Sequence, residues 1–373
     1  KVSEIGFGCE GFGELDPEES MHLIRTGYDA GINMIDLFSP KEKIRRNIGD
    51  SLERLKIRER FVIQGQLGTT VVNGHYKRTR DIEIVRESFE NLLECLHTDY
   101  LDIGMIHYVD DEKDFESVFH GEFIAYVLEQ KKKGVIHLVG ASSHNPVIAK
   151  KMIATGLLDV LLFSINPCFD MAPPSEDLQN LFHQDYYKGI DYHIHPEREE
   201  LYRLCEDKGI AITVMKCFAG GNLLDEHLSV FHKAMTPVQC ISYALHMPGT
   251  VSVMIGVKSE AELKEALAYE KCPASEKDFS SFLAELEGDD MEGVCVYCGH
   301  CSPCVKGIDI ASVNKYTALG KGQKNIPDSI KDHYFLLQKD ASDCIGCRSC
   351  EKNCPFHVHI REKMKEAEIL FGY

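Results

Sequence analysis

Two runs of closely spaced cysteines near the C-terminal end of the chain are the residues best suited to chemistry. The second run, Cys344, Cys347, Cys350 and Cys354 followed by Pro355, has the spacing C-x2-C-x2-C-x3-C-P. In this pattern three thiolates surround one [4Fe–4S] cluster and the fourth ligates a neighbouring cluster. Applied to both runs, the rule predicts one cluster on Cys295, Cys298, Cys301 and Cys354, and another on Cys344, Cys347, Cys350 and Cys304.

The first run departs from the pattern at its end. The gap before Cys304 is one residue shorter than the gap before Cys354, and Val305 stands where proline is usual. The ligation of Cys304 therefore stays open. Two fully cysteine-ligated clusters favour electron transfer, whereas a cluster without Cys304 would favour binding of a substrate at iron.

A zinc ribbon and a disulfide framework are the alternatives for these cysteines. Zinc would use the C-x2-C pairs but gives no reason for the Cys-Pro ending or for the offset of the fourth thiol. Disulfide frameworks belong to small secreted domains, and a chain of 373 residues does not need one. The pattern therefore favours iron–sulfur clusters.

Composition limits the class of protein and its partners. The chain is long enough for one large domain and a small one, and its formal net charge of −18 argues against nucleic acid and anionic membranes as partners. No stretch approaches the roughly 20 apolar residues of a membrane-spanning helix. No signal peptide is visible, although the chain begins at Lys1. Scattered thiols outside the two runs fit a reducing cytoplasm, such as that of an anaerobe.

Short apolar runs alternate with helical patterns over the first 270 or so residues. Strands are expected at 5–8, 32–37, 61–63, 101–106, 138–141, 160–165, 210–215 and 251–255, each followed by a helical pattern. Eight such units predict an α/β fold, a (β/α)8 TIM barrel. A doubly wound open sheet is less favoured, since no G-x-G-x-x-G opens a strand–helix unit.

The expected domains are a barrel over 1–272, a connecting segment over 273–290 with an acidic helix at 275–287, and a small α-helical, ferredoxin-like domain over 291–373 that carries the two [4Fe–4S] clusters. Helices are expected there at 310–319, 328–337 and 360–371. Within the barrel, the long connection 166–195 is a candidate lid because loops of that length are seldom tight turns.

Polar residues follow the expected barrel strands at their C-terminal ends, where TIM-barrel enzymes place their active sites. They are Cys9, Glu10, Asp36, Gln66, His107, Ser142 to Asn145, Asn166, Cys168, Lys216, Cys217, Gly256 and Lys258. We expect a small-molecule site at this end of the barrel.

Several of these segments resemble the aldo-keto reductase family, and most of all its branch with a C-terminal ferredoxin-like domain. The similar segments are Gly6 to Gly8, Asn33 to Asp36, Asp102 to His107, Gly140 to Ser143 and Met215 to Gly221. The resemblance implies reduction of carbonyl compounds with NADPH by a tetrad of Asp, Tyr, Lys and His.

Only half of that tetrad is retained. Asp36 and His107 match the Asp and the His, but Gln66 occupies the lysine position and no tyrosine lies between Asp36 and Arg60. A glutamine carries no charge, so the usual route to general acid catalysis is closed. Without its cation, a buried Asp36 should have a raised pKa or find other partners. Lys41, Lys77 and Lys216 are candidate replacement cations.

The basic stretch 73–80 offers a replacement phenol. It contains Tyr76 and Lys77, which would restore a Tyr–Lys pair if the loop covered the barrel mouth, and it could also bind an anionic substrate group. The alternative is a solvated loop before the next helix. His75, His144, His193 and His195 lie on the same side and are candidate metal ligands, and Cys9 and Cys217 are candidate reactive thiols.

The resemblance also suggests positions for NADP(H). Ser142 and Ser143 would meet the nicotinamide carboxamide, and Gly220, Gly221 and Leu223 the pyrophosphate. Lys258 would bind the 2′-phosphate, and Lys216 would lie at the same end of the barrel as a further cofactor-binding residue. Glu262 and Ala266 replace amide side chains of that loop, and a carboxylate there is unfavourable beside a phosphate. NADP(H) is therefore a candidate cofactor.

We expect an iron–sulfur oxidoreductase. Its two clusters would carry electrons between a redox partner, such as a ferredoxin, flavodoxin or flavoprotein, and a small substrate at Asp36, Gln66 and His107. The alternatives are a non-catalytic electron-transfer subunit and a redox-neutral lyase or isomerase. The sequence predicts no oligomeric state.

Overall fold

Eight parallel strands form a closed barrel in the computed structural model, which describes residues 1–182, 184–187, 193–284, 293, 295, 297–321, 326 and 328–372. Around the barrel the strands run in the order β1-β10-β9-β8-β7-β6-β3-β2. Their bounds are β1 (Ile5–Gly8), β2 (Met34–Leu37), β3 (Val62–Leu67), β6 (Leu101–Ile106), β7 (Ile136–Ser143), β8 (Val160–Ser164), β9 (Ala211–Met215) and β10 (Thr250–Gly256). The predicted TIM barrel is confirmed.

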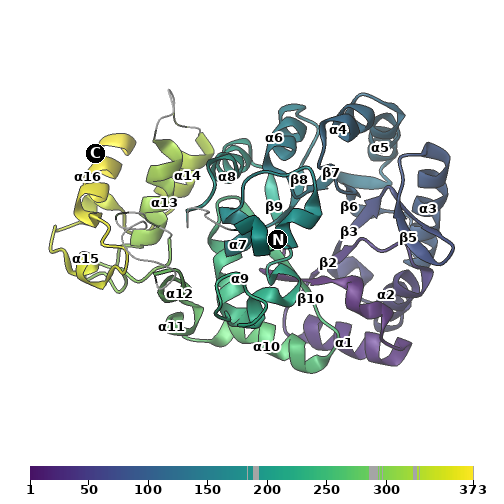
Figure 1. Cartoon of the computed structure of the whole chain (residues 1–373), viewed down its shortest axis with the longest axis horizontal. Helices are drawn as coiled ribbons and strands as arrows, with labels where there is room; N and C mark the ends of the chain where they lie inside the picture. Colours follow the sequence, from purple (N-terminus) through teal and green to yellow (C-terminus); the bar gives the residue numbers. More distant parts are fainter. Residues whose placement is uncertain are drawn as a thin grey trace.

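Helices surround this barrel (Figure 1). They are α1 (Pro17–Asp29), α2 (Glu42–Leu55), α3 (Ile82–Cys95), α4 (Glu112–Phe119), α5 (Glu122–Lys133), α6 (Pro146–Ala154), α7 (Pro167–Met171), α8 (Pro196–Lys208), α9 (Pro237–His246) and α10 (Glu260–Lys271). Their ends follow local signals. Asp16 and Glu19 form a reciprocal capping box at the start of α1, and Gly209, with φ of 65°, ends α8.

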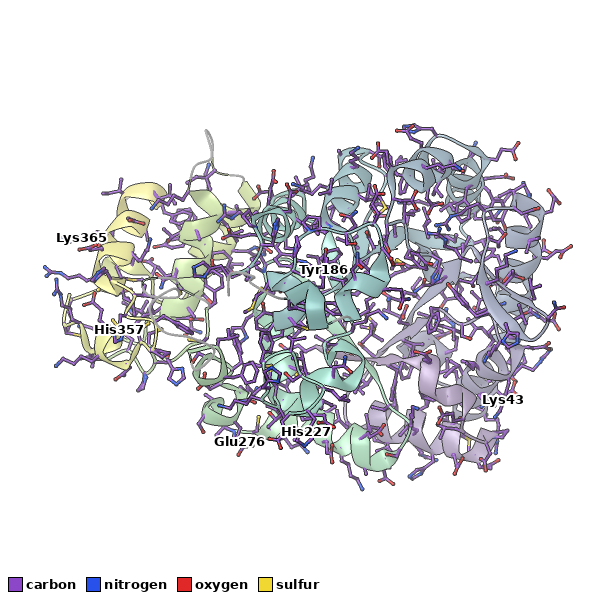
Figure 2. All side chains as sticks on the ribbon, in the orientation of Figure 1. Lys43, Tyr186, His227, Glu276, His357 and Lys365 are labelled. Carbon is purple, nitrogen blue, oxygen red and sulfur yellow. The ribbon has the colours of Figure 1, made fainter. Side chains whose placement is uncertain are left out.

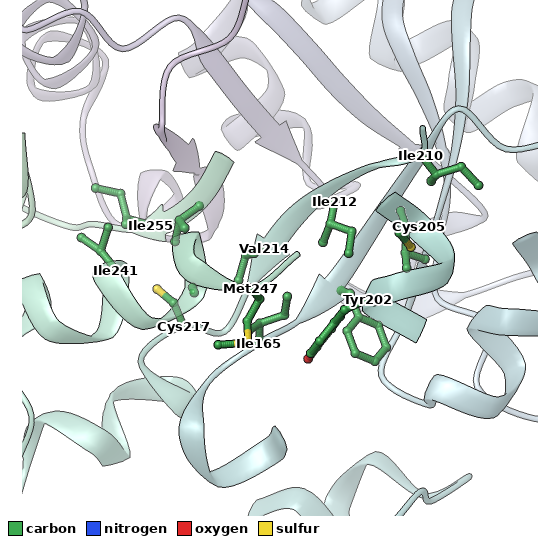
Figure 3. Packing of buried hydrophobic residues seen from close by; sticks show 14 of the residues in the cluster. Ile165, Tyr202, Cys205, Ile210, Ile212, Val214, Cys217, Ile241, Met247 and Ile255 are labelled. Atoms are coloured by element: carbon green, nitrogen blue, oxygen red, sulfur yellow. The ribbon is translucent and has the colours of Figure 1, made fainter. Parts of the chain in front are cut away.

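The barrel interior holds a small apolar cluster below the mouth, made by Met34, Ile103, Met105, Val160, Leu162 and Met254. Gly6 and Gly140 make room for it: a Cβ on either would lie within 3.0 Å of the Met254 or Met105 thioether. The larger core lies between the strands and the helices. Figure 3 shows part of it, where Tyr202 and Cys205 of α8 and Met247 after α9 pack near Ile212 and Val214 of β9.

A separate hairpin follows β3, where the sequence pattern indicates a loop. Strands β4 (Thr69–Val72) and β5 (His75–Arg78) pair antiparallel and form a sheet of their own. Asn73 and Gly74 connect them with φ of 52° and 80°, the conformation of a type I′ turn. Helix α4 is a second element that the sequence analysis did not identify.

The candidate lid 166–195 is only partly a surface cover. All five residues of α7 at its start are buried, and two short helical turns follow, η3 (Leu178–Phe182) and η4 (Gln184–Tyr187). Asp170 of α7 accepts hydrogen bonds from Arg198 at 3.0 Å, Tyr202 at 2.5 Å and Tyr243 at 2.9 Å. Its first part is therefore fixed to α8 and α9, and residues 183 and 188–192 lie outside the described part.

The C-terminal tail is helical, as expected, and lies at one end of the molecule beside α8 and α9 (Figure 1). Its helices are α13 (Ile310–Gly320), α14 (Asp328–Phe335), α15 (Ser349–Asn353) and α16 (Ile360–Phe371). The predicted helix 275–287 is instead two short helices, α11 (Ala274–Lys277) and α12 (Ser280–Ala284). The break falls at Asp278, whose carboxylate accepts from the Ser280 backbone at 2.8 Å. Residues 285–292 lie outside the described part.

Contacts fix the tail to the barrel. His333 of α14 lies 3.1 Å from Glu206 of α8, and the Gln239 amide of α9 donates to the Asp278 carbonyl at 2.7 Å. Within the described residues, no helix has the length and apolar character needed to cross a membrane.

Candidate active site and cluster-binding cysteines

Asp36 of β2 lies inside the barrel and is held by amides. Gln64 and Gln66 of β3 donate to its Oδ1 at 2.9 and 3.2 Å, and Thr213 of β9 donates to Gln64 Oε1 at 3.1 Å. Burial raises the pKa of Asp36 to about 6, although these two amide hydrogen bonds act to lower it. The raised pKa and the new hydrogen bonds both agree with the expectation for a carboxylate that lacks its lysine.

His107, directly after β6, continues this chain of hydrogen bonds. Because Gln66 donates to Asp36 through Nε2, its Oε1 faces His107 Nδ1, which must then carry the ring proton. Nε2 of His107 is left as an acceptor. Burial, followed by the nearby Arg80, lowers the pKa of His107 well below its ordinary value, so the ring is neutral at pH 7.

Tyr76 of β5 completes the chain. Its hydroxyl donates to Nε2 of His107, and partial burial raises the pKa of the phenol to about 12. The side chain is 39% exposed, so its hydroxyl is held by His107 while the ring remains open to solvent. The order Tyr76, His107, Gln66, Asp36 forms one directed line from the surface into the barrel.

The hairpin is fixed over His107 by two arginines. Arg80 makes two hydrogen bonds to Asp114 of α4, at 2.9 and 2.7 Å, and Arg78 reaches the same carboxylate at 3.1 Å. Arg80 also donates to the His107 and Tyr108 carbonyls at 2.8 Å each. These arginines hold the hairpin that carries the phenol, and binding of a substrate anion by the same basic stretch stays a prediction. Lys77 is exposed, on the other face of the hairpin from Tyr76 because side chains alternate along a strand.

Asp110, which follows β6, organises the residues after β7. Its carboxylate accepts from Ser143 Oγ at 2.9 Å, from the His144 backbone at 2.6 Å and from His144 Nδ1 at 2.8 Å. Ser142 donates to the Ile106 carbonyl at 3.4 Å. Both serines are buried and already hydrogen-bonded within the protein.

The other candidate NADP(H) positions lie on two loops. Lys216 follows β9, and burial lowers its pKa. Gly220 and Gly221 have φ of 71° and 99° in the next turn. Lys258, after β10, pairs with Glu14 at 2.9 Å, and its backbone N–H donates to Glu262 at 2.7 Å. The carboxylates of Glu14 and Glu262 therefore lie beside Lys258, the residue expected to bind the 2′-phosphate.

A cavity of about 220 Å³ lies between the connection after β8 and the loop after β9. No cation among the described residues lines it; its residues are Cys168, Leu181, Ala219, Asn222, Leu223, Leu228, Ser229 and Val230. These residues and the surroundings of Lys258 do not fit a dinucleotide phosphate, since a phosphate needs cations or convergent donors. NADP(H) binding stays a prediction.

The remaining candidates are dispersed. His75 is exposed on the hairpin, and His195 accepts from the Glu197 backbone at the start of α8. Cys9 and Cys217 are buried thiols whose pKa values burial raises, that of Cys217 to about 12. In the part of the chain that the structure describes, no three His, Cys, Asp or Glu side chains gather as ligands of a single metal ion.

Four cysteines from the two runs surround one cavity in the tail. Cys295, Cys298 and Cys301 line it together with Cys354 from the second run, and ligation of one cluster by these four stays a prediction. Asn314 donates to Cys295 Sγ at 3.4 Å, and backbone N–H groups of Lys306 and Gly346 donate to Cys304 and Cys344, each at 3.4 Å. Thiolates with N–H donors fit an iron–sulfur cluster.

Three supporting residues, Gln64, Asp110 and Asp114, escaped the sequence analysis, and each left a signal. Gln64 and Gln66 are two apart, so both amides share the inner face of β3. Asp114 lies three residues after Asp111, which caps α4, and Asp110 directly precedes that cap. The hairpin left a signal as well, because Asn-Gly at 73–74 between an apolar and an aromatic residue favours a turn that brings Tyr76 over the mouth.

Comparison with known proteins supports this reading of the fold. The aldo/keto reductase family model matches residues 4–236, and a 4Fe-4S binding domain model matches residues 337–358. The holo form of aldo-keto reductase AKR11C1 from Bacillus halodurans superimposes with a TM-score of 0.58 at 19% identity, over 77% of this chain and 93% of that one. That structural likeness shows the fold alone.

Two curated relatives match parts of the chain. The NADH-specific methylglyoxal reductase of Escherichia coli is 26% identical over 225 residues, which are 56% of this chain and 60% of that protein. Aldo-keto reductase YhdN of Bacillus subtilis is 26% identical over 153 residues, 38% of this chain and 44% of its own. Both matches span less than two thirds of the relative. The family match covers most of the barrel, and the chain belongs to the aldo/keto reductase family of oxidoreductases, with a 4Fe-4S domain after the barrel.

Proposed function

We propose that the protein interconverts a small carbonyl compound and its alcohol at the barrel mouth, with electrons carried by two iron–sulfur clusters in the tail. The observation that carries this proposal is the hydrogen bond from Tyr76 to His107. It places the Tyr76 phenol beside His107, which matches the substrate-site histidine of aldo/keto reductases. The phenol comes from a hairpin after β3 and not from the segment after β2.

The line of hydrogen bonds can hold and move one proton. In the oxidation direction, a substrate hydroxyl passes its proton to the Tyr76 oxygen while Tyr76 passes its own proton to Nε2 of His107. The imidazolium so formed keeps Gln66 as the acceptor for Nδ1–H, with the Asp36 carboxylate behind it. Reduction runs the same transfers in reverse and protonates the carbonyl oxygen.

Neutral His107 and protonated Tyr76 are the states this relay needs. The lowered pKa of His107 and the raised pKa of Tyr76 keep both groups in those states at pH 7. A lysine in place of Gln66 would repel the imidazolium. The glutamine is therefore matched to a histidine that accepts the proton.

Reduction of a carbonyl takes two electrons and two protons: one proton reaches the oxygen from Tyr76, and the other is taken from water and ends on the carbon. Iron–sulfur clusters, when bound, supply electrons one at a time, so two clusters match the electron count. Cys295, Cys298, Cys301 and Cys354 would hold one cluster, and Cys344, Cys347, Cys350 and Cys304 the other. His300, beside the first set, lies 2.6 Å from Ser280 Oγ and 3.1 Å from Asp278, so this cluster would lie at the barrel side of the tail.

An anaerobic screen of small aldehydes and ketones tests the proposal. Dithionite-reduced methyl viologen serves as donor in one arm, and NADPH or NADH in the other. We expect viologen-dependent turnover in the wild type and its loss in His107→Ala and Asp36→Asn. Turnover that is unchanged in both variants would place the reaction elsewhere. Turnover with nicotinamide cofactor alone would refute the electron route through the clusters.

A further inference from the structure

The tail differs in charge from the rest of the molecule. The chain has a formal net charge of −18, yet Lys and Arg outnumber Asp and Glu within residues 301–373. Residues 1–300, which comprise the barrel and the acidic connection after it, are therefore the strongly acidic part. The two parts lie at opposite ends of the long axis, with α15 and α16 farthest from the barrel (Figure 1). Figure 2 shows the same separation between His357 and Lys365 of the tail and Lys43 of the barrel.

Exposed cations and an exposed aliphatic side chain lie within and just after the second cysteine run. We call this surface the cluster face and define it by Ile345, Cys347, Arg348, Lys352 and Arg361. Ile345 is 60% exposed and Cys347 is exposed, as are Lys352 and Arg361. An exposed aliphatic side chain beside an exposed cysteine and three cations is unusual for a surface that meets only water.

Short contacts hold the cluster face together. The Arg361 guanidinium lies 3.2 Å from the position a Cβ on Gly346 would take, and the Arg361 backbone N–H donates to Glu351 Oε1 at 2.8 Å. Arg348 lies 3.6 Å from the same Glu351, whose side chain is only 18% exposed. Glu351 is thus poorly exposed and partly neutralised, whereas Glu362 beside Arg361 is exposed.

We propose that the cluster face is the docking surface for a small acidic ferredoxin, which exchanges electrons with the second cluster. This inference rests on the proposed function, since it needs electrons to pass through the tail. The exposed Cys347 brings the metal site of the second run to the surface, where a carrier's own cluster can approach closely. Charge complementarity favours an acidic carrier, and complexes of this kind are small, transient and steered by electrostatics.

The position of the cluster face reduces the electrostatic repulsion between this protein and an acidic carrier. An acidic carrier is repelled by the acidic barrel, but the face lies at the far end of the molecule. At physiological ionic strength charges are screened beyond about 8 Å, so the cations of the face dominate the local field. Electrons would then enter at the outer cluster and leave through the inner one, beside Asp278 and α9.

Binding of a purified acidic [2Fe–2S] ferredoxin to the iron–sulfur-loaded protein tests this proposal. Both proteins are kept oxidised, so no turnover is involved, and the Kd is measured by isothermal titration calorimetry. The double variant Lys352→Glu with Arg361→Glu reverses two charges of the face. A carboxylate at position 361 also suits the first turn of α16, so the helix should be kept. Arg25→Glu, at an exposed position of α1 on the barrel, makes the same kind of reversal away from the face.

We expect wild type and the Arg25→Glu variant to bind alike, with affinity that falls as salt rises from about 0.01 M. The double variant should bind roughly tenfold more weakly or worse at low salt, with unchanged visible absorbance and acid-labile sulfide. Equal binding by the double variant, or binding that ignores salt, would overturn the proposal. So would self-association that is lost in the double variant, since the face would then bind a second copy of this chain.

The binding measurement is independent of the catalytic screen. A protein that binds ferredoxin at this face but reduces no carbonyl would contradict the proposed function and leave the docking surface standing. A protein that turns over with methyl viologen but fails to bind ferredoxin would support the proposed function and overturn the docking surface.

Discussion

The hydroxyl of Tyr76 donates to Nε2 of His107, although the two residues come from different elements of the fold. Their rings lie 5.7 Å apart at an interplanar angle of 74°, which lets the phenol approach the imidazole edge. The family resemblance alone implies that half of the proton relay is missing. In the structure, a phenol from the hairpin lies beside His107, and the amide of Gln66 contacts Asp36 where the family has a lysine.

Replacing Tyr76 with phenylalanine removes the hydroxyl and keeps the ring. Because Tyr76 is at the surface end of the relay, we expect turnover to fall by about 10²- to 10⁴-fold, the usual contribution of a general acid or base. Tyr100→Phe is the matched control, since Tyr100 lies at the opposite end of β6. Steady-state rates with the best substrate of the screen measure both. A rate that falls equally in the two variants would point to a general loss of structure.

Asp36 should make stability depend on pH in an acidic window. Its pKa is about 6 in the folded state against 3.8 unfolded, so the folded state holds the proton more tightly. The stabilisation is present below pH 3.8 and is lost as pH rises through 6. Asp36→Asn still accepts from both glutamines but cannot ionise. We expect it to be more stable than wild type at pH 7.5 by on the order of 3 kcal/mol.

Urea unfolding under anaerobic conditions measures this difference. The variant and wild type should converge as pH is lowered toward 4, since both are then uncharged at this position. A constant difference across the window would show that the effect comes from packing and not from ionisation. The same variant should lose turnover, so stability and activity change in opposite directions.

Asp114→Asn should loosen the hairpin. The substitution leaves Arg80 and Arg78 without their shared carboxylate, and loss of one partner in a poorly exposed ion pair costs about 3–5 kcal/mol. Amide hydrogen exchange of β4 and β5 should accelerate, while the barrel strands stay protected. Lys77→Ala is the control on the same hairpin, because Lys77 is exposed. Protection lost throughout the barrel would contradict a local anchoring role.

Cys354→Ala tests the crossed ligation. Cys354 belongs to the second run in sequence but lines the cavity of the first, so the variant should lose the cluster held by Cys295, Cys298 and Cys301. We expect about half of the iron to remain, with one electron paramagnetic resonance signal after reduction. Cys347→Ala should remove the other signal. Loss of the same signal in both variants would refute the crossed arrangement.

The fold is predictable from the sequence where its signals are local. The strands at 5–8 and 101–106 and the helix at 360–371 have the expected bounds, since apolar periodicity is clear there. The hairpin escapes prediction because its strands are short and partly exposed, and a basic stretch with a turn also describes a loop. Once the segment is known to be a strand, alternation of side chains places Tyr76 and Arg78 on one face.

The residues of the relay are identifiable from the sequence, but not their connections. Asp36, Gln66 and His107 follow from the strand ends, and Tyr76 from its neighbourhood. That Gln66 faces both Asp36 and His107 depends on where β2, β3 and β6 lie side by side, which spacing along the chain does not specify. Gln64 shares the inner face of β3 with Gln66, but its hydrogen bond to Asp36 depends on the pairing of β2 with β3.

The hairpin that carries Tyr76 shares no strand pairing with the barrel. A ribbon of this kind can change its length, twist or tip while the eight-stranded wall stays closed. If the hairpin covers the substrate as proposed, a change in its length or twist would alter the reach of Tyr76 without breaking a strand pair of the barrel. The segment that would limit the substrate and the strands that close the barrel are then separate stretches of chain.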